Sequence, residues 1–352
     1  MPKAKPIVLV TGASGYVGLA VVKAFLDSNN YAVCGTVRDP TNEAKVAPLK
    51  ALPNQASLTL FKADLLDSAE TWDAAVSDCA YVVHTASPFV LSPKDVQRDL
   101  LDPAIKGTEA VLSAIARNGK VEKTVVTSSI GAIMCDKWDV PEHGYVYSEK
   151  DWNTAASAMY NPYIYSKVMA ERRAWEIAKE ANFDLCCVNP GFVMGPPLSK
   201  TSSTSLTFMA DLIQGKFSSG AVDDRQCVVD VRDVAKAHVL AIEKGVPGKR
   251  YLCAHGSRVG INYVQMGAHV EKAYPSLAKK LPHRNFGKPI MYLVGKLAAG
   301  ISPYKIYMNF GLDFNYDVSL IEQDLGMEWT SLDDTFGEMA KKMEELGMCK
   351  LE

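Results

Sequence analysis

The sequence predicts an α/β fold with a doubly wound parallel sheet, covered by helices on both faces and followed by a smaller C-terminal part. Two observations predict it. Short apolar runs alternate with helical patterns over the first half of the chain, and a glycine-rich turn joins the first run to the first helix. The 352 residues, 48% of them hydrophobic, can bury a large core in one domain or two.

The strands of this sheet are expected where β-branched runs are fully apolar or nearly so. A half-exposed antiparallel sheet would instead alternate polar and apolar residues. The expected strands are 7–10, 32–37, 58–62, 81–84, 124–127 and 184–189, and the helices between them include 15–28, 99–117 and 163–180.

The glycine-rich turn, Thr11-Gly-Ala-Ser-Gly-Tyr-Val-Gly18, follows the first strand directly. Gly12 permits a tight turn, Gly15 lets the backbone approach a pyrophosphate, and Gly18 lets the helix pack close to the sheet. A glycine trio alone also suits an ordinary strand–turn–helix. Its place at the start of an all-parallel pattern of strands and helices favours a dinucleotide site. The predicted contacts here are Gly12, Ser14, Gly15, Tyr16, Val17 and Gly18.

The end of the second strand favours NADP over NAD. Arg38 comes before Asp39, and a guanidinium can pair with a 2′-phosphate, whereas an acid at this point would bind the 2′-hydroxyl of NAD. Lys45 supplies a second cation. The alternative is that both cations are merely solvated and Asp39 binds the ribose.

Asp64, at the end of the third strand, is placed to accept a hydrogen bond from the adenine amino group, with Leu65 beside it. Asp64 could equally be the N-cap of the next helix. Both interpretations stay open.

Carbonyl reduction by hydride transfer needs a proton donor and a neutral hydroxyl that holds the carbonyl oxygen. Tyr163 and Lys167 stand at i and i+4, so both project from one helix face. The ammonium is expected to stabilise the tyrosinate and lower the pKa of the phenol from ~10 towards about 7. Ser128 and Ser129 follow the fifth strand with side chains in different directions; Ser129 is favoured, and strand-end capping would account for one of the two.

The same Tyr-x-x-x-Lys spacing recurs at Tyr292 and Lys296. Tyr163 lies between the fifth and sixth strands, near the carboxyl ends where ligands bind. Tyr292 lies in the apolar stretch 289–301, which we interpret as a core helix with Tyr292 packed inside and Lys296 reaching solvent.

Composition argues against several other classes of partner. The net charge of -2 gives no field that would gather nucleic acid or an anionic membrane, so small molecules are the expected partners. The eight cysteines lack metal-ligand spacing and are interpreted as free thiols, and we expect no metal. With no apolar signal segment at the start, a cytoplasmic protein is expected.

After Asn189 the sequence becomes rich in proline and glycine, followed by the loop-like stretch 199–205. We expect residues 1–190 to form an NADP-binding Rossmann domain, to which residues around 225–245 return. Residues 191–352 are expected to form mainly a substrate-binding domain that ends with the helix 332–346.

These motifs together resemble the extended short-chain dehydrogenases/reductases, in the branch of dihydroflavonol reductases, cinnamoyl-CoA reductases and yeast methylglyoxal/aldehyde reductases. The resemblance spans nearly the whole chain. It is carried by residues 11–18, 36–40, 84–88, 98–101, 127–129, 161–167, 189–190 and 230–238.

The resemblance implies a triad of Ser129, Tyr163 and Lys167. It also implies cofactor contacts for Arg38 and Lys45 at the 2′-phosphate, Val83, Thr85 and Ser87 at the ribose, Thr127, and Pro190 and Val193 at the nicotinamide. His238 is interpreted as structural.

Two departures concern the substrate. Met134 stands where flavonoid-reducing relatives place an Asn, which argues against a dihydroflavonol, and the spacing from Arg38 to Lys45 differs by one from cinnamoyl-CoA reductases. An apolar pocket is expected from position alone, with core packing an equal account of each member: Phe89, Ile130, Met159, Met194 and Phe208.

The resulting hypothesis is an NADPH-dependent reductase of aldehydes or ketones, reversible as an alcohol dehydrogenase, with Tyr163 as proton donor and a monomer or homodimer as the active form. One alternative is a nucleotide-sugar epimerase or dehydratase that holds NAD permanently, against which Arg38 argues. The other is an NADP-binding sensor without chemistry, which the Tyr163/Lys167 pair disfavours.

Overall fold

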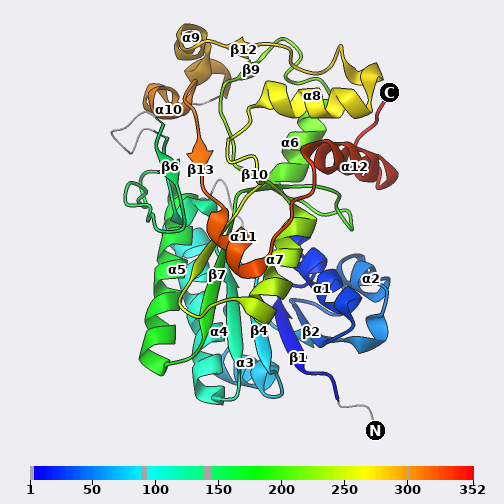
Figure 1. The fold of residues 1–352 in the computed structure, drawn as a ribbon, viewed down its shortest axis with the longest axis vertical. Coiled ribbons are helices and arrows are strands. Elements are labelled where there is room, and N and C mark those ends of the chain that lie inside the picture. The colour runs from blue at the N-terminus through cyan, green and yellow to red at the C-terminus, as the bar shows by residue number, and fades with distance from the viewer. Residues whose placement is uncertain (1–3, 89–92, 138–143, 300–301) are drawn as a thin grey trace.

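The computed structural model describes residues 4–88, 93–137, 144–299 and 302–352. In these residues seven parallel strands form one sheet in the order β11-β7-β5-β4-β1-β2-β3 (Figure 1). The predicted fold class is confirmed, and all six predicted strands belong to this sheet. The strands are β1 (Ile7–Thr11), β2 (Ala32–Val37), β3 (Leu58–Lys62), β4 (Tyr81–His84), β5 (Lys123–Thr127), β7 (Leu185–Pro190) and β11 (Arg250–Cys253).

The strand order reverses direction beside β1, which pairs with β2 on one side and β4 on the other. After β1 the chain continues to β2 on one side, and after β4 it continues to β5 on the other side. In such sheets a crevice forms between the carboxyl ends of the two strands from which the connections diverge. In the register, Thr11 lies opposite His84. The end of β5 lies next in line, where Thr127 is opposite Val188 of β7.

Helices cover both faces of the sheet. One face packs against α1 (Tyr16–Ser28), α7 (Val231–Lys244) and α11 (Ser319–Leu325), with α2 (Glu43–Lys50) at its edge. The other packs against α3 (Ala69–Val76), α4 (Asp102–Asn118) and α5 (Pro162–Ala181). The strands are apolar because both of these faces are buried.

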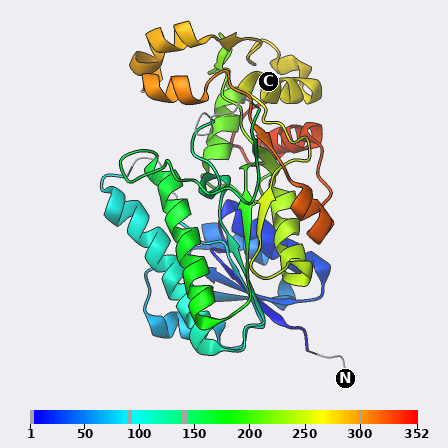
Figure 2. The ribbon, with the colours of Figure 1, turned by 60° about the vertical axis from the view of Figure 1, so that its left-hand side comes forward.

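The chain beyond Pro190 divides between the sheet and a second layer above its carboxyl edge (Figures 1 and 2). α7 and β11 pack on the sheet. α6 (Thr204–Ile213), α8 (Tyr263–Ala273) and α12 (Leu332–Glu345) share a separate apolar core, beside α9 (Lys288–Ala299) and α10 (Pro303–Asn309). Short parallel pairs complete this part: β8 (Phe192–Met194) with β10 (Val228–Asp230), β9 (Ala221–Val222) with β12 (Asn285–Phe286), and β6 (Val146–Tyr147) with β13 (Asn315–Tyr316). The division into two domains stays a prediction.

The interpretation of residues 289–301 as a core helix is wrong for the side chains that the structure describes there. In α9 the side chains of Ile290, Tyr292 and Leu293 are 49%, 42% and 74% exposed, while Met291 is buried. Met291 packs in a small apolar cluster with residues of α10. Among the described residues no helix is both long and apolar enough to cross a membrane.

Candidate active site

The glycine-rich turn is fixed by backbone packing that leaves no room for side chains. Gly12 has φ +66°, a left-handed conformation that favours glycine, and a Cβ there would lie 3.0 Å from the Cα of Ala86. A Cβ at Gly18 would lie 2.2 Å from the carbonyl oxygen of Gly12. Gly15 is the N-cap of α1 and has no capping side chain. The first N–H groups of α1 are therefore left for another acceptor, as an anion site requires.

Residues around the turn hold it against β2 and against the later chain. Thr36 Oγ1 accepts a hydrogen bond from the Gly12 N–H at 3.1 Å. A Cβ at Gly35 would lie 2.9 Å from Ala13 Cβ, so this glycine also belongs to the turn. Gly35 was not predicted as part of the turn, although a glycine inside an apolar strand often marks such a close approach. The Tyr16 hydroxyl donates to the Gly195 carbonyl at 2.7 Å, so the phenol contacts the residue that directly follows β8.

Two exposed cations lie close together in the chain after β2: Arg38 follows the strand directly and Lys45 lies in the first turn of α2. Neither side chain has an ion pair or hydrogen bond with the described residues. Asp39 instead accepts hydrogen bonds from Thr41, from its N–H at 2.9 Å and its hydroxyl at 2.6 Å, and these bonds lower the pKa of Asp39. The carboxylate that would bind a 2′-hydroxyl is therefore engaged in a local turn.

Asp64 is not a helix cap. Helix α3 begins at Ala69 with Ser68 at the N-cap, four residues further along the chain. Asp64 Oδ1 accepts from the Leu66 N–H at 3.2 Å, so it belongs to the turn that precedes the helix. Leu65 packs against Gly107 of α4. The contact of Asp64 with adenine stays a prediction.

The end of β4 approaches the glycine turn through Thr11. The Thr85 hydroxyl donates to the Thr11 carbonyl, and the Ala86 N–H donates to Thr11 Oγ1 at 3.0 Å. Val83 is fully buried in the core, whereas Thr85 and Ser87 are half-buried at the sheet edge. The last two are therefore the more accessible members of the predicted ribose contacts.

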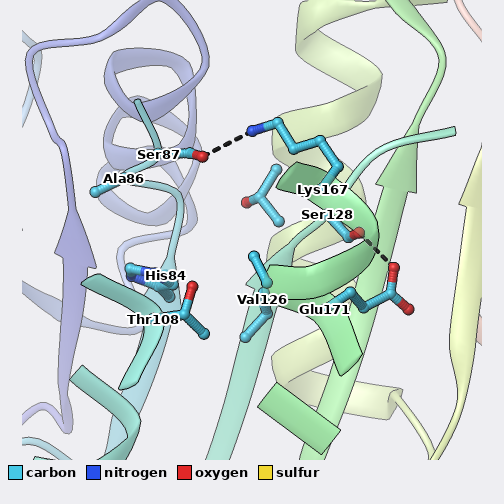
Figure 3. Close-up of a pocket in the computed structure, with 10 residues that line it drawn as sticks. His84, Ala86, Ser87, Thr108, Val126, Ser128, Lys167 and Glu171 are labelled. Atoms are coloured by element: carbon cyan, nitrogen blue, oxygen red, sulfur yellow. Dashed lines mark hydrogen bonds between the residues drawn. The ribbon is translucent and has the colours of Figure 1, made fainter. Parts of the chain in front are cut away.

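Tyr163 and Lys167 lie in the first two turns of α5, which begins at Pro162 after Asn161 in a left-handed conformation. Lys167 Nζ lies 5.3 Å from the centroid of the Tyr163 ring and donates to Ser87 Oγ at 2.7 Å (Figure 3). Burial lowers the pKa of Lys167 to about 8 and raises that of Tyr163 to about 12. The expected lowering of the Tyr163 pKa is therefore wrong for this structure, because burial disfavours the charged tyrosinate.

The two adjacent serines point in different directions, as their place at a strand end predicts. The Ser128 hydroxyl donates to the carboxylate of Glu171 (Figure 3). Ser129 has extended backbone and its Oγ accepts from the Gly131 N–H at 3.1 Å, capping a turn at Ile130–Ala132. The O–H of Ser129 is not used by this cap, because a hydroxyl can accept and donate together. Capping and a role towards substrate are thus compatible at Ser129.

A buried ion pair that the sequence analysis missed lies behind the serines. Glu171, on the buried face of α5, accepts from Arg250 Nε at 2.5 Å and from Asn189 Nδ2 at 2.7 Å. Arg250 stacks on Trp152, with its guanidinium carbon 3.9 Å from the ring centroid. Asn189 also donates to the Ser129 carbonyl at 3.2 Å. The network therefore connects α5, β7, β11 and the end of β5. The sequence contained one signal for it: Glu171 is a charged residue four positions after Lys167, on the same helix face.

Three further predicted contacts lie at the ends of β5 and β7 and in β8. Thr127 Oγ1 lies 2.6 Å from His238 Nε2, and His238 Nδ1 bonds to the Val234 carbonyl. Burial lowers the pKa of His238 to about 4, so the imidazole is neutral and held inside the fold. Pro190 is the buried last residue of β7, and Val193 is half-buried in β8.

Of the described residues that were predicted for an apolar pocket, only Met194 and Phe208 share one apolar cluster, the core of α6, α8 and α12. Met194 is fully buried there, and the Phe208 ring lies 4.6 Å from that of Tyr263 between centroids. Met159 is 98% exposed. Ile130 is half-buried beside Ser129, and Phe89 lies outside the described residues.

The second Tyr-x-x-x-Lys pair lies on α9, in the upper layer of Figure 1 and away from the sheet. Tyr292 is 42% exposed, so the interpretation of Tyr292 as core packing is wrong. The side chain of Lys296 lies outside the described part of the structure. The position of α9 leaves Tyr163 and Lys167 as the pair at the crevice.

A small polar pocket lies beneath Lys167, between the ends of β4 and β5 and the helices α4 and α5 (Figure 3). Among the described residues no cluster of His, Cys, Asp or Glu has the arrangement of a metal site. The pocket is lined by His84, Ala86, Ser87, Thr108, Val126, Thr127, Ser128, Lys167, Ala170 and Glu171.

Known proteins are similar to this chain in sequence and in fold. The model of the NAD dependent epimerase/dehydratase family matches residues 8–254. Cinnamoyl-CoA reductase 1 of Arabidopsis thaliana is 36% identical over 97% of this chain and 90% of its own length. An anthocyanidin reductase of Vitis vinifera is 32% identical over 78% of this chain and 82% of its own.

Among solved structures, yeast methylglyoxal/isovaleraldehyde reductase Gre2 complexed with NADPH has a TM-score of 0.77 and 25% identity, over 97% of this chain and 99% of that one. Gre2 from Candida albicans in complex with NADPH matches with the same TM-score at 27% identity, over the same shares of the two chains. The chain belongs to the NAD dependent epimerase/dehydratase family, among the extended short-chain dehydrogenases/reductases, and is an oxidoreductase.

Proposed function

We propose that this protein is an NADPH-dependent carbonyl reductase, with Ser129, Tyr163 and Lys167 as its catalytic residues. The observation that carries the proposal is the meeting of α5 with the ends of β4 and β5. There Lys167 reaches Ser87 at 2.7 Å from the same helix face that carries Tyr163. Two findings among the relatives support it: cinnamoyl-CoA reductase and a methylglyoxal/isovaleraldehyde reductase are among them, and two of the solved structures contain NADPH.

The residues at the crevice fit a phosphorylated dinucleotide. The glycine turn offers backbone N–H groups to a pyrophosphate, and the two exposed cations Arg38 and Lys45 suit a 2′-phosphate. The Asp39 carboxylate accepts hydrogen bonds from Thr41. This argues against the NAD alternative, in which that carboxylate would bind the ribose. When bound, the nicotinamide would supply the hydride.

The chain's own groups would supply the proton and the orientation. Burial keeps the Tyr163 phenol protonated at neutral pH, which is the form that can donate to a developing alkoxide. The Ser129 O–H would hold the carbonyl oxygen, and Lys167 would hold the ribose and favour the tyrosinate that forms. Pro190 and Val193 would border the nicotinamide.

The test is a spectrophotometric assay of NADPH and NADH oxidation with a panel of aldehydes, ketones and aromatic acyl-CoA thioesters. We expect turnover with external NADPH for at least one class, and weaker turnover with NADH. The nucleotide content of the purified protein is measured alongside. Tightly held NAD without turnover of external NADPH would contradict the proposal and favour an epimerase or dehydratase.

A further inference from the structure

The polar pocket beneath Lys167 contains a hydrogen-bond donor that no described residue satisfies. His84 is 2% exposed at the end of β4, and its Nε2 is buried without a partner in the described part of the chain. A buried polar atom without a partner is costly, so native structures usually satisfy it with an ordered water or another group. The proposed reaction does not use His84.

The bonds of Thr11 decide which nitrogen of His84 carries the proton. Thr11 is fully buried, and its Oγ1 accepts from the Ala86 N–H at 3.0 Å. The only acceptor that the described residues offer to its O–H is His84 Nδ1, at 2.9 Å. Thr11 therefore donates to Nδ1, and the neutral imidazole carries its hydrogen on Nε2. Burial, aided by the charge of Lys167, lowers the pKa of His84 to about 4 and keeps it neutral.

The groups that line the pocket can supply the hydrogen-bond partners of a single water molecule. Lys167 donates one of its three N–H groups to Ser87, so the other N–H groups are available to the pocket. Thr108 donates to the Ala104 carbonyl and Ser128 donates to Glu171, so the lone pairs of both hydroxyls can accept. The lining thus offers two donors and two acceptors, and the space suits about one water.

We propose that this pocket binds one water molecule, which accepts from His84 Nε2 and Lys167 Nζ and donates to Thr108 and Ser128, and that His84 is a positioning residue for Lys167. The water takes one hydrogen of the ammonium below, while Ser87 takes another at the sheet edge. Figure 3 shows these groups on the walls around the pocket. This role rests on the proposed function of Lys167.

The water also stabilises the charge of a buried ammonium. In the described part of the chain, the titratable and charged groups around Lys167 are His84 from β4 and Tyr163 and Glu171 from α5, with Arg250 of β11 paired to Glu171. His84 and Tyr163 are neutral, and Arg250 offsets Glu171. Loss of the water would remove a hydrogen bond to the charged amine, so Lys167 would lose its proton at lower pH.

The test uses two substitutions of His84 that separate the role of its Nδ1 from the role of its Nε2. His84→Asn keeps an acceptor for Thr11 and removes the donor that faces the pocket, whereas His84→Gln carries an N–H group towards the position of Nε2. We expect the basic limb of the pH profile of kcat for reduction to move down by about one pH unit in His84→Asn. We expect His84→Gln to restore most of that shift. A purely structural role of the Thr11 bond predicts the reverse order, which would overturn the proposal.

Thr108→Val supplies a second variant that does not touch His84, with Thr124→Val as its control. Thr124 is a buried threonine like Thr108, but it lies near the start of β5, whereas the pocket is at the end of that strand. Thr108→Val should move the basic limb in the same direction as His84→Asn, and Thr124→Val should leave it in place. Equal profiles for both threonine variants would contradict the proposal.

A crystal structure of the wild-type protein at a resolution that shows ordered waters gives a readout independent of activity. We expect one water within hydrogen-bond distance of His84 Nε2, and none there in His84→Asn. A pocket without solvent density in the wild type would overturn this inference and leave the proposed function intact. If the water is present and no carbonyl is reduced, the proposed function fails while the binding site stands.

Discussion

The two ends of the crevice are held in different ways. At the proposed cofactor end, Arg38 and Lys45 are exposed and the turn is shaped by glycine backbone. At the proposed chemical end, Asn189 joins the Ser129 carbonyl to Glu171, which lies on the same helix as Lys167. Glu171 pairs with Arg250, and the two side chains are 0% and 7% exposed. From this difference we expect surface substitutions to change the choice of cofactor, and substitutions in the buried network to change the chemistry.

Substitution at the chemical end should have the largest effect. Tyr163→Phe removes the proposed proton donor, and we expect kcat for reduction to fall by about 10²- to 10⁴-fold. The dissociation constant of NADPH, measured by fluorescence titration, should change little. Tyr292→Phe, in the second Tyr-x-x-x-Lys pair, is the matched control. Equal loss in both variants would remove the distinction between the two pairs.

Breaking the buried ion pair should cost stability. Arg250→Ala leaves Glu171 buried without its cation, and we expect the free energy of unfolding to fall by about 3–5 kcal/mol. Arg173→Ala is the control, since Arg173 pairs with Glu109 on the surface of the same helix layer. Its loss should be at most about 1 kcal/mol. Urea denaturation of both variants measures the difference, and similar losses would show that burial of the pair is unimportant.

Acid should weaken the buried end of the site first. The pKa values of His84 and His238 are lowered to about 4, so between pH 6.5 and 4 the unfolded chain binds more protons than the folded chain. The free energy of unfolding should therefore fall as the pH drops through this window, by about 3 kcal/mol for each histidine.

His238→Gln should flatten this dependence, because the variant no longer has a proton to gain at that position on unfolding. The control is His283→Gln, which changes an exposed histidine in the upper layer. Thermal denaturation between pH 4 and 7 measures both. An unchanged slope in His238→Gln would contradict the account of a buried neutral imidazole.

The exposed end should respond through cofactor choice alone. Arg38→Ala removes a charged donor from the proposed 2′-phosphate, and we expect the KM for NADPH to rise by about 10-fold or more. The KM for NADH and kcat should change little. Arg117→Ala, which removes another exposed arginine, is the control.

The smallest effect is expected at Asp39. Asp39→Asn keeps an acceptor for Thr41, so the KM values for both cofactors should stay within about twofold. The NAD alternative predicts the opposite pattern, with a large rise in the KM for NADH. This pair of variants therefore shows which side chain selects the cofactor.

Local patterns predicted the sheet because its strands are buried on both faces and read as apolar runs. β11 was missed because it is short and begins with Arg250, a charge whose partner Glu171 lies 79 residues earlier in the chain. Apolar content likewise misled the interpretation of α9, where Leu293 is exposed. Sequence alone contains no record of such distant pairing or of which apolar faces stay uncovered.

The candidate site divides in the same way. Spacing within one helix or turn placed Tyr163, Lys167 and Gly18, because these relations are local. The different directions of Ser128 and Ser129 followed from strand geometry. The partner of Ser128, the neutral state of Tyr163 and the exposed position of Met159 depend on tertiary packing, and position in the sequence could not supply them.

The most direct test of the central claim is the fate of the hydride. A carbonyl substrate from the panel is reduced with NADPH that carries deuterium at the transferring position of C4, and the alcohol is examined by mass spectrometry. The account predicts one deuterium on the former carbonyl carbon, with stoichiometric NADP formation. An unlabelled product, or label that stays with a nucleotide bound to the protein, would contradict it.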